Sequence, residues 1–193
     1  MKTRNLLMIA LFPMSTLLFS TSVFAQEKSY QVDPVHSNVV FRVKHSDLAY
    51  VYGQFLKFDG SVDYNADKPS ATSIEWTVDA DSVFTNHRKR DGHLKSPDFF
   101  NAKQHPKISF KSTKVTKKGD KLRVKGKLTL NGKTRTVSTD VELTGSGKDQ
   151  EGNPRLGFLS EFSIDRSDFG MDFMVGPVSD QVDLTVSTEV VSK

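Results

Sequence analysis

Apolar and polar side chains alternate along most of the chain, and this two-residue period constrains the fold more than any other feature. Successive side chains of a β-strand point to opposite faces, so such alternation indicates strands with one buried and one solvated face. Parallel sheets, which are covered on both faces, instead show continuous apolar runs. The pattern therefore predicts an all-β fold of short antiparallel strands. The alternating segments lie at 38–44, 74–80, 122–130, 137–143, 156–164 and 182–190.

Turn residues separate these segments where hairpins would need them. Asn131-Gly132 lies between two strand patterns, which is a strong signal for a two-residue β-hairpin. We expect eight or nine strands in total. An all-β chain must protect its sheet edges, so we expect the strands to close into an antiparallel eight-stranded barrel. The interior of such a barrel is filled by side chains or holds one small ligand.

One stretch breaks the alternation. Residues 85–102 read TNHRKRDGHLKSPDFFNA and are dense in charge. The stretch is too long for an ordinary connection, so we expect it to be helical or functional. It predicts a short helical segment around 86–102, with Asn86 as the N-cap and with Phe99 and Phe100 pointing inward.

The first 25 residues have the layout of a secretory signal peptide. Lys2 and Arg4 precede an apolar run that ends at Val23-Phe24-Ala25. This order predicts cleavage between Ala25 and Gln26. The alternative is an uncleaved membrane anchor, but Pro13 and several hydroxyl residues interrupt the run. We therefore expect a cleaved signal peptide at 1–25 and a single secreted β-barrel domain at 26–193.

Charge and cysteine content exclude several classes of function. Of the 27 Lys and Arg, two lie in the leader, so 25 remain against 23 Asp and Glu, a net charge of +2. This small excess of basic residues does not indicate a nucleic-acid partner. In the Lys-rich stretch 111–127, the basic residues from Lys121 to Lys127 alternate with Leu122, Val124, Gly126 and Leu128, which favours the solvated face of a strand over a docking site for an acidic surface. The chain has no cysteine, so it has no disulfide and no thiol nucleophile.

Known signatures of catalytic and metal sites are missing from the sequence. It has no Walker loop, no G-x-S-x-G elbow and no H-E-x-x-H zinc motif. His36 and His45 flank the first long strand pattern and point to opposite faces, so they cannot share a metal by themselves. Asp165, Arg166 and Asp168 favour a salt bridge within a turn over an acid–base pair. We assign no catalytic residue, no metal ligand and no cofactor.

Several short patterns along the chain do resemble one family. They include Tyr30, Asp33 and His36-Ser37; Arg88, Asp91, His93-Leu94, Ser96, Asp98 and Phe99-Phe100; and Asp168-Phe169-Gly170. Together with the exported β pattern, this arrangement resembles the YceI-like family of secreted polyisoprenoid-binding proteins. The resemblance implies a lipocalin-like barrel that holds one small amphiphilic lipid, with an isoprenoid or fatty chain, in a tunnel. It supplies no catalytic residues and leaves a homodimer and transient membrane contact open.

Candidate binding residues follow from this implied tunnel. Burial of a hydrocarbon chain contributes about 0.8 kcal/mol per methylene, and polar groups at the mouth would orient the ligand. Ordinary core packing is the alternative for each wall residue, and a structural hydrogen bond is the alternative for His45. For the apolar wall we expect Phe41, Val43, Phe55, Trp76, Phe110, Leu128, Phe158 and Phe162. For the polar mouth we expect His45, Arg88, Asp91, His93 and Arg166.

Three functions fit these observations. The first is a periplasmic carrier or scavenger of a prenyl-type lipid without catalysis, and we favour it. The second is a stress-related, chaperone-like binding module whose cavity is filled. The third is an enzyme that acts on a lipid in the same barrel, with the Arg88–His93 segment as its site.

Overall fold

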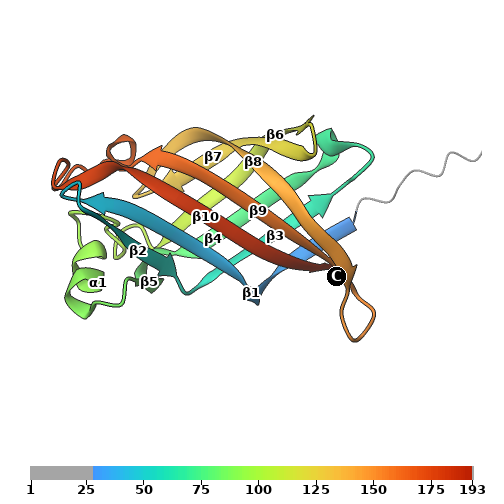
Figure 1. Cartoon of the computed structure of the whole chain (residues 1–193), viewed down its shortest axis with the longest axis horizontal. Helices are drawn as coiled ribbons and strands as arrows, with labels where there is room; N and C mark the ends of the chain where they lie inside the picture. The colour runs from blue at the N-terminus through green and yellow to red at the C-terminus, as the bar shows by residue number, and fades with distance from the viewer. Residues whose placement is uncertain (1–27, 193) are drawn as a thin grey trace, which may run out of the picture.

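The computed structural model describes residues 28–192, so the expected leader and its cleavage site lie outside the described residues. Strands dominate this part of the chain (Figure 1). No helix within it is long and apolar enough to cross a membrane. The strands are β1 (Lys28–His45), β2 (Ala49–Phe55), β3 (Phe58–Tyr64), β4 (Ser73–Asp79), β5 (Val83–Phe84), β6 (Lys107–Lys118), β7 (Lys121–Leu130), β8 (Lys133–Lys148), β9 (Pro154–Asp165) and β10 (Val178–Ser192).

The strands form one antiparallel sheet that closes on itself. Their order is β10-β9-β8-β7-β6-β4-β3-β1-β2-β5, and a further pairing between β1 and β10 completes the ring. The early residues of β1 pair with β3 and its later residues pair with β2, so β2 and β3 follow each other along one side of β1. In the same way β4 pairs with β3 and β5 pairs with β2, so the ten strands occupy eight positions around the barrel. The result is a closed eight-stranded antiparallel β-barrel, which confirms the predicted fold class.

The hairpin between β7 and β8 is built as the sequence predicts. Leu130 and Lys133 are paired, and only Asn131 and Gly132 lie between them. Both turn residues have positive φ angles, 48° and 70°. A two-residue turn of this kind needs left-handed backbone at both positions, which Asn and Gly adopt at low cost.

The first strand is longer than the sequence pattern indicates. β1 begins at Lys28, so His36 lies inside it and does not flank it as expected. The pairing with β10 shifts register between Asp33 and Asn38, and this bulge interrupts the alternation. Pro has no backbone N–H to donate to a neighbouring strand, and a bulged residue makes no such hydrogen bond. The bulge therefore accounts for Pro34 in the middle of a strand.

The segment between β4 and β6 leaves the sheet and contains the only α-helix among residues 28–192. This helix, α1 (Arg88–Leu94), confirms the predicted helical segment but is shorter than the range 86–102. Its N-cap is His87, whose Nδ1 accepts a hydrogen bond from the Arg90 amide at 3.3 Å, so Asn86 as the cap was wrong. Asn86 instead has a φ of 59°, in the left-handed region.

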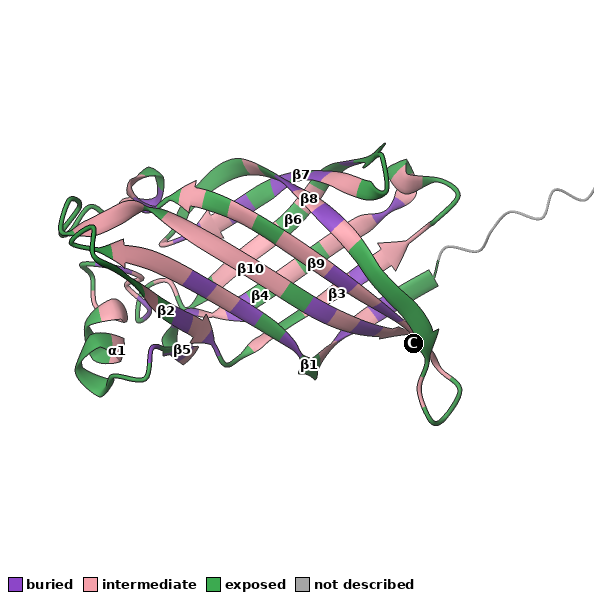
Figure 2. Ribbon diagram, in the orientation of Figure 1, coloured by how far each residue is buried: buried purple, intermediate pink, exposed green. Residues whose placement is uncertain are grey.

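Burial alternates along the strands (Figure 2), and the inward residues pack into three clusters. Phe99 is buried and Phe100 packs with two of these clusters, as predicted. The connections divide between two ends of the barrel. The α1 end carries the turn at 46–48, the segment 80–106, the hairpin at 131–132 and the loop 166–177; the far end carries the connections 65–72, 119–120 and 149–153.

Candidate functional site

A cavity of about 420 Å³ lies inside the barrel. Its lining comes mostly from the inward side chains of the strands, which explains why it is predominantly apolar. All eight residues expected at the wall lie on it: Phe41, Val43, Phe55, Trp76, Phe110, Leu128, Phe158 and Phe162. Four of them, Phe41, Phe55, Leu128 and Phe158, are also members of the buried clusters. These side chains therefore pack against one another and bound the cavity at the same time.

The cavity extends along much of the barrel. On β10 the lining runs from Val178 to Thr188. Ten residues of strand rise about 33 Å, and the usual barrel tilt shortens this to about 25 Å along the axis. Tyr64 and Leu122 line the cavity toward the far end, while His45 lines it at the α1 end. The shape therefore suits an elongated molecule.

Three glycines let aromatic rings lie flat against the wall. A Cβ added at Gly53 would lie 2.2 Å from the Phe41 ring, and one at Gly126 would lie 2.4 Å from the Phe110 ring. At Gly60 the added Cβ would lie 3.2 Å from the Trp76 ring. Each ring occupies the space that a side chain would take on the neighbouring strand. The glycines thereby keep these rings out of the middle of the barrel.

Three of the five residues expected at the mouth line the cavity. They are His45, His93 and Arg166. Arg88 and Asp91 are not among the lining residues, whereas Arg90 is. The sequence indicated a charged helix here, but a helix of seven residues gives too little periodicity to show which of its side chains face inward.

Asp91 has a structural role in positioning α1. Its Oδ1 accepts hydrogen bonds from the amide and the hydroxyl of Thr85, at 2.8 and 2.5 Å. Arg90 donates to the Thr85 hydroxyl at 2.8 Å and to its carbonyl at 2.7 Å. Together these bonds attach the helix to the segment that follows β5.

Arg166 is buried at the α1 end of the cavity, with 3% of its surface exposed. Its guanidinium donates hydrogen bonds to four backbone carbonyls, at 2.5 to 3.1 Å. The predicted salt bridge of Arg166 with Asp165 or Asp168 is therefore wrong. Burial lowers the pKa of Arg166 from its ordinary value. The residue therefore organises the loop 171–179 around a largely desolvated positive charge. The four acceptors belong to Met171, Phe173, Val178 and Ser179.

A group of three rings joins the two segments at the mouth. His93 lies 5.0 Å from Phe99 and 5.3 Å from Phe173, measured between ring centroids. Phe99 and Phe173 lie 5.7 Å apart, and all three contacts are edge-to-face. His93 also hydrogen-bonds to Asp98 at 2.8 Å through Nε2. This aromatic triad holds the loop 166–177 against the segment that contains α1.

The charged groups that line the cavity have one sign. They are the guanidinium groups of Arg90 and Arg166; His45 and His93 also line the cavity, and no carboxylate does so among the described residues. A long apolar space with cationic and hydrogen-bond-donating groups at one end suits an amphiphile whose headgroup accepts hydrogen bonds. Met171 and Met174 complete the lining at this end, and the sequence analysis did not identify them.

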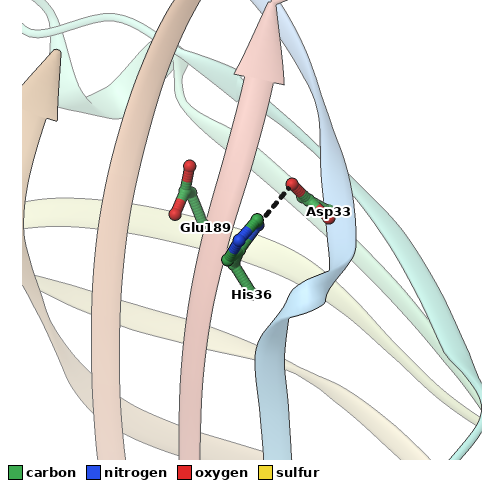
Figure 3. Close-up of side chains that lie close together, drawn as sticks. All are labelled: Asp33, His36 and Glu189. Atoms are coloured by element: carbon green, nitrogen blue, oxygen red, sulfur yellow. Dashed lines mark hydrogen bonds and ion pairs between the residues drawn. The ribbon is translucent and has the colours of Figure 1, made fainter. Parts of the chain in front are cut away.

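A second polar cluster lies outside the cavity, at the bulge in β1. Asp33, His36 and Glu189 offer ligand atoms within 4.8 Å of one another (Figure 3). Arg155 donates to Asp33 at 2.6 Å and to Glu189 at 2.7 Å, so a side-chain cation already pairs with both carboxylates. Hydrogen bonds from His36 and Arg155 hold the pKa of Asp33 well below its usual value. The cluster ties β9 to the bulge and to β10.

Comparison with known proteins gives the same barrel. A YceI-like domain matches residues 30–190, which is most of the chain. The chain belongs to the YceI-like family. Protein YceI of Salmonella newport is 39% identical over 183 residues, which cover 94% of this chain and 96% of the relative. A UPF0312 protein of Pectobacterium atrosepticum is 39% identical over 182 residues, which cover 94% and 95%.

Solved structures of similar proteins have the same architecture. Burkholderia cenocepacia BcnA matches with a TM-score of 0.76 and 26% identity, covering 82% of this chain and 98% of that one. A YCEI protein of Campylobacter jejuni matches with a TM-score of 0.71 and 26% identity, covering 93% and 99%. A polyisoprenoid-binding domain from Saccharophagus degradans matches with a TM-score of 0.65 and 12% identity, covering 86% and 100%, a likeness of fold alone.

Proposed function

We propose that this YceI-like protein binds a polyisoprenoid or similar long-chain amphiphile in its barrel, without catalysis. The observation that carries the proposal is the elongated apolar cavity, which has its charged lining at the α1 end. Burial of hydrocarbon there supplies the binding free energy, and Arg90, His93 and Arg166 orient the headgroup. The polyisoprenoid-binding domain of Saccharophagus degradans, which has the same fold, supports the choice of ligand class.

The cavity supports binding better than turnover. Among residues 28–192, no hydroxyl is hydrogen-bonded to His45 or His93, so neither histidine activates a nucleophile there. The hydroxyls of Thr139 and Ser160, which line the cavity, bond to each other at 2.8 Å. A catalytic arrangement would bring a nucleophile and a base within hydrogen-bond distance.

The proposed site of action is the periplasm, with residues 26–193 as the mature domain. The basic start, the apolar run and the Ala25-Gln26 junction carry this proposal. A lipid with a long apolar tail is poorly soluble in that aqueous space, so a closed barrel would shield it from water.

Native mass spectrometry of protein purified by gentle lysis tests this function. We expect the mature mass plus the mass of a lipid. Val186→Trp, which places a large ring in the cavity lining, should remove the added mass while the protein stays folded. Ser187→Trp is the matched control, because Ser187 is exposed on the same strand and does not line the cavity. Bare protein from the native compartment, or unfolding of the Val186→Trp variant alone, would favour a filled, non-carrier barrel.

A further inference from the structure

Large apolar side chains are exposed on two loops at the α1 end. Leu48, in the turn between β1 and β2, is 85% exposed. Phe173, Met174 and Val175, in the loop before β10, are 43%, 43% and 45% exposed. These two loops lie at the same end of the barrel as α1 (Figure 1). We refer to Leu48, Phe173, Met174 and Val175 as the apolar rim.

The apolar rim belongs to one connected structure at the mouth of the cavity. The amide of Ser46 donates to the carbonyl of Pro177 at 2.7 Å, which ties the two loops together. Met174 is exposed and also lines the cavity. The apolar surface of the cavity therefore continues outward onto the rim.

The far end has a different surface. Its connections at 65–72, 119–120 and 149–153 carry mainly polar, charged and small residues, and none of the large exposed apolar residues among 28–192 lies in them. Single exposed apolar residues lie elsewhere too, among them Val35, Leu56 and Leu143, as on every protein surface. Four such residues on two connected loops at the mouth of an apolar cavity indicate an interaction site.

Two basic residues of α1 lie at the same end of the barrel as the apolar rim. Arg88 and Lys89 are exposed on α1 and take part in no ion pair among the described residues. His45 and His93 add donors at the mouth. Exposed apolar side chains and cationic groups at one end of a molecule suit the surface of a bilayer, where acyl chains lie beneath anionic headgroups.

We propose that the α1 end docks on the surface of a lipid bilayer, with the apolar rim inserted among the lipids. This inference rests on the proposed function, because docking places the cavity mouth where an amphiphile can pass between membrane and barrel without crossing water. The far end stays in solvent, and Arg88 and Lys89 contact the headgroups.

Vesicle sedimentation tests the docking surface. The protein purified from its native compartment is mixed with vesicles of phosphatidylethanolamine and phosphatidylglycerol. We expect it to sediment with them, and the double variant Leu48→Ser/Val175→Ser to lose at least tenfold in apparent affinity. Neither residue lines the cavity. Val35→Ser is the matched control, because Val35 is 81% exposed but lies in the β1 bulge, away from both loops, and should sediment like the unaltered protein.

The same samples separate docking from ligand binding. Native mass spectrometry should show that Leu48→Ser/Val175→Ser keeps its lipid, which would place the defect in docking alone. No sedimentation of the unaltered protein, or an equal loss in Val35→Ser, would overturn the docking proposal even if lipid is present in the cavity. A dimer in analytical ultracentrifugation that Leu48→Ser/Val175→Ser dissociates would also overturn it, because the rim would then be an interface between two copies. Sedimentation without any bound lipid would overturn the proposed function and leave the docking surface standing.

Discussion

At the scale of single residues, two arginines hold regions of the molecule that the strand ladder does not. Arg166 satisfies four carbonyls of a loop that has little regular structure of its own. Arg155 joins Asp33, Asp149 and Glu189 where β1 bulges away from the regular register with β10. In both places the guanidinium, a planar group with several N–H donors, makes hydrogen bonds where backbone pairing between strands is missing.

Replacement of Arg166 should strongly destabilise the protein. Arg166→Leu leaves buried carbonyls without donors, so we expect the free energy of unfolding to fall by about 3 kcal/mol. Urea denaturation followed by circular dichroism measures this. Arg88→Leu is the control, because Arg88 is exposed on α1 and its loss should change stability by less than about 0.5 kcal/mol. Equal effects of the two substitutions would contradict the assigned role.

Stability should fall in acid through Asp33. The pKa of Asp33 is lower in the folded protein than in the unfolded chain, where it is about 3.9, so its contribution is complete above about pH 5 and is lost as pH falls. The groups that face it are His36, Arg155 and Glu189. We expect Asp33→Asn to be less stable at neutral pH and to lose less stability on acidification.

Urea midpoints at several pH values below 6 would show this change. Asp120→Asn, in the exposed turn between β6 and β7, serves as the control and should keep the acid dependence of the unaltered protein. An unchanged acid dependence in Asp33→Asn would show that other carboxylates carry the effect.

At the scale of elements, the strands could be predicted because one buried face imposes a period of two, and the 131–132 turn could be predicted because its backbone demands Asn-Gly. The bulge in β1 could not, since residues 34–37 lie opposite a single residue of β10 and so remove the period that identifies a strand. The cap at His87 was missed because Asn86 is the more common capping residue. Alternation along the strands indicates which side chains face inward and so belong to the wall. The residues at the mouth depend instead on the direction of side chains on one short helix, which the sequence does not show.

Gly53 lies against the Phe41 ring, so even the methyl group of alanine should be poorly tolerated there. Gly53→Ala would push the Phe41 ring toward the cavity, so we expect a loss of about 1–3 kcal/mol in stability and less bound lipid. Gly145→Ala on β8 is the control, because nothing lies within 4 Å of its added Cβ. Phe41→Leu in the same chain should restore part of the loss. A double variant no better than Gly53→Ala would contradict the assigned contact.

At the scale of the whole molecule, an asymmetry runs along the barrel axis. Apolar side chains bound the middle, cationic groups line the α1 end, and polar turns cover the far end. The α1 end carries the long excursion from the sheet, residues 85–106, which follows β5. A ligand with a tail and a head therefore has one favoured orientation, with the head toward α1.

Affinity should rise with tail length until the cavity is full. Each methylene that the cavity buries contributes about 0.8 kcal/mol, or about fourfold in Kd. A displacement titration with linear fatty acids of increasing length would show this rise and then a plateau. Val186→Trp should move the plateau to shorter tails, whereas Ser187→Trp should not. Affinity independent of tail length would contradict burial of the tail.

The pairing of β1 with β10 makes the order of synthesis matter. Tyr30 is opposite Ser192, so the first described strand of the chain finds its partner in the last. Until the 15 residues of β10 emerge, the remaining strands form an open sheet with two unprotected edges. Such distant pairing slows folding. Loss of only a few C-terminal residues would leave part of β1 unpaired, and the exposed strand edges would favour aggregation.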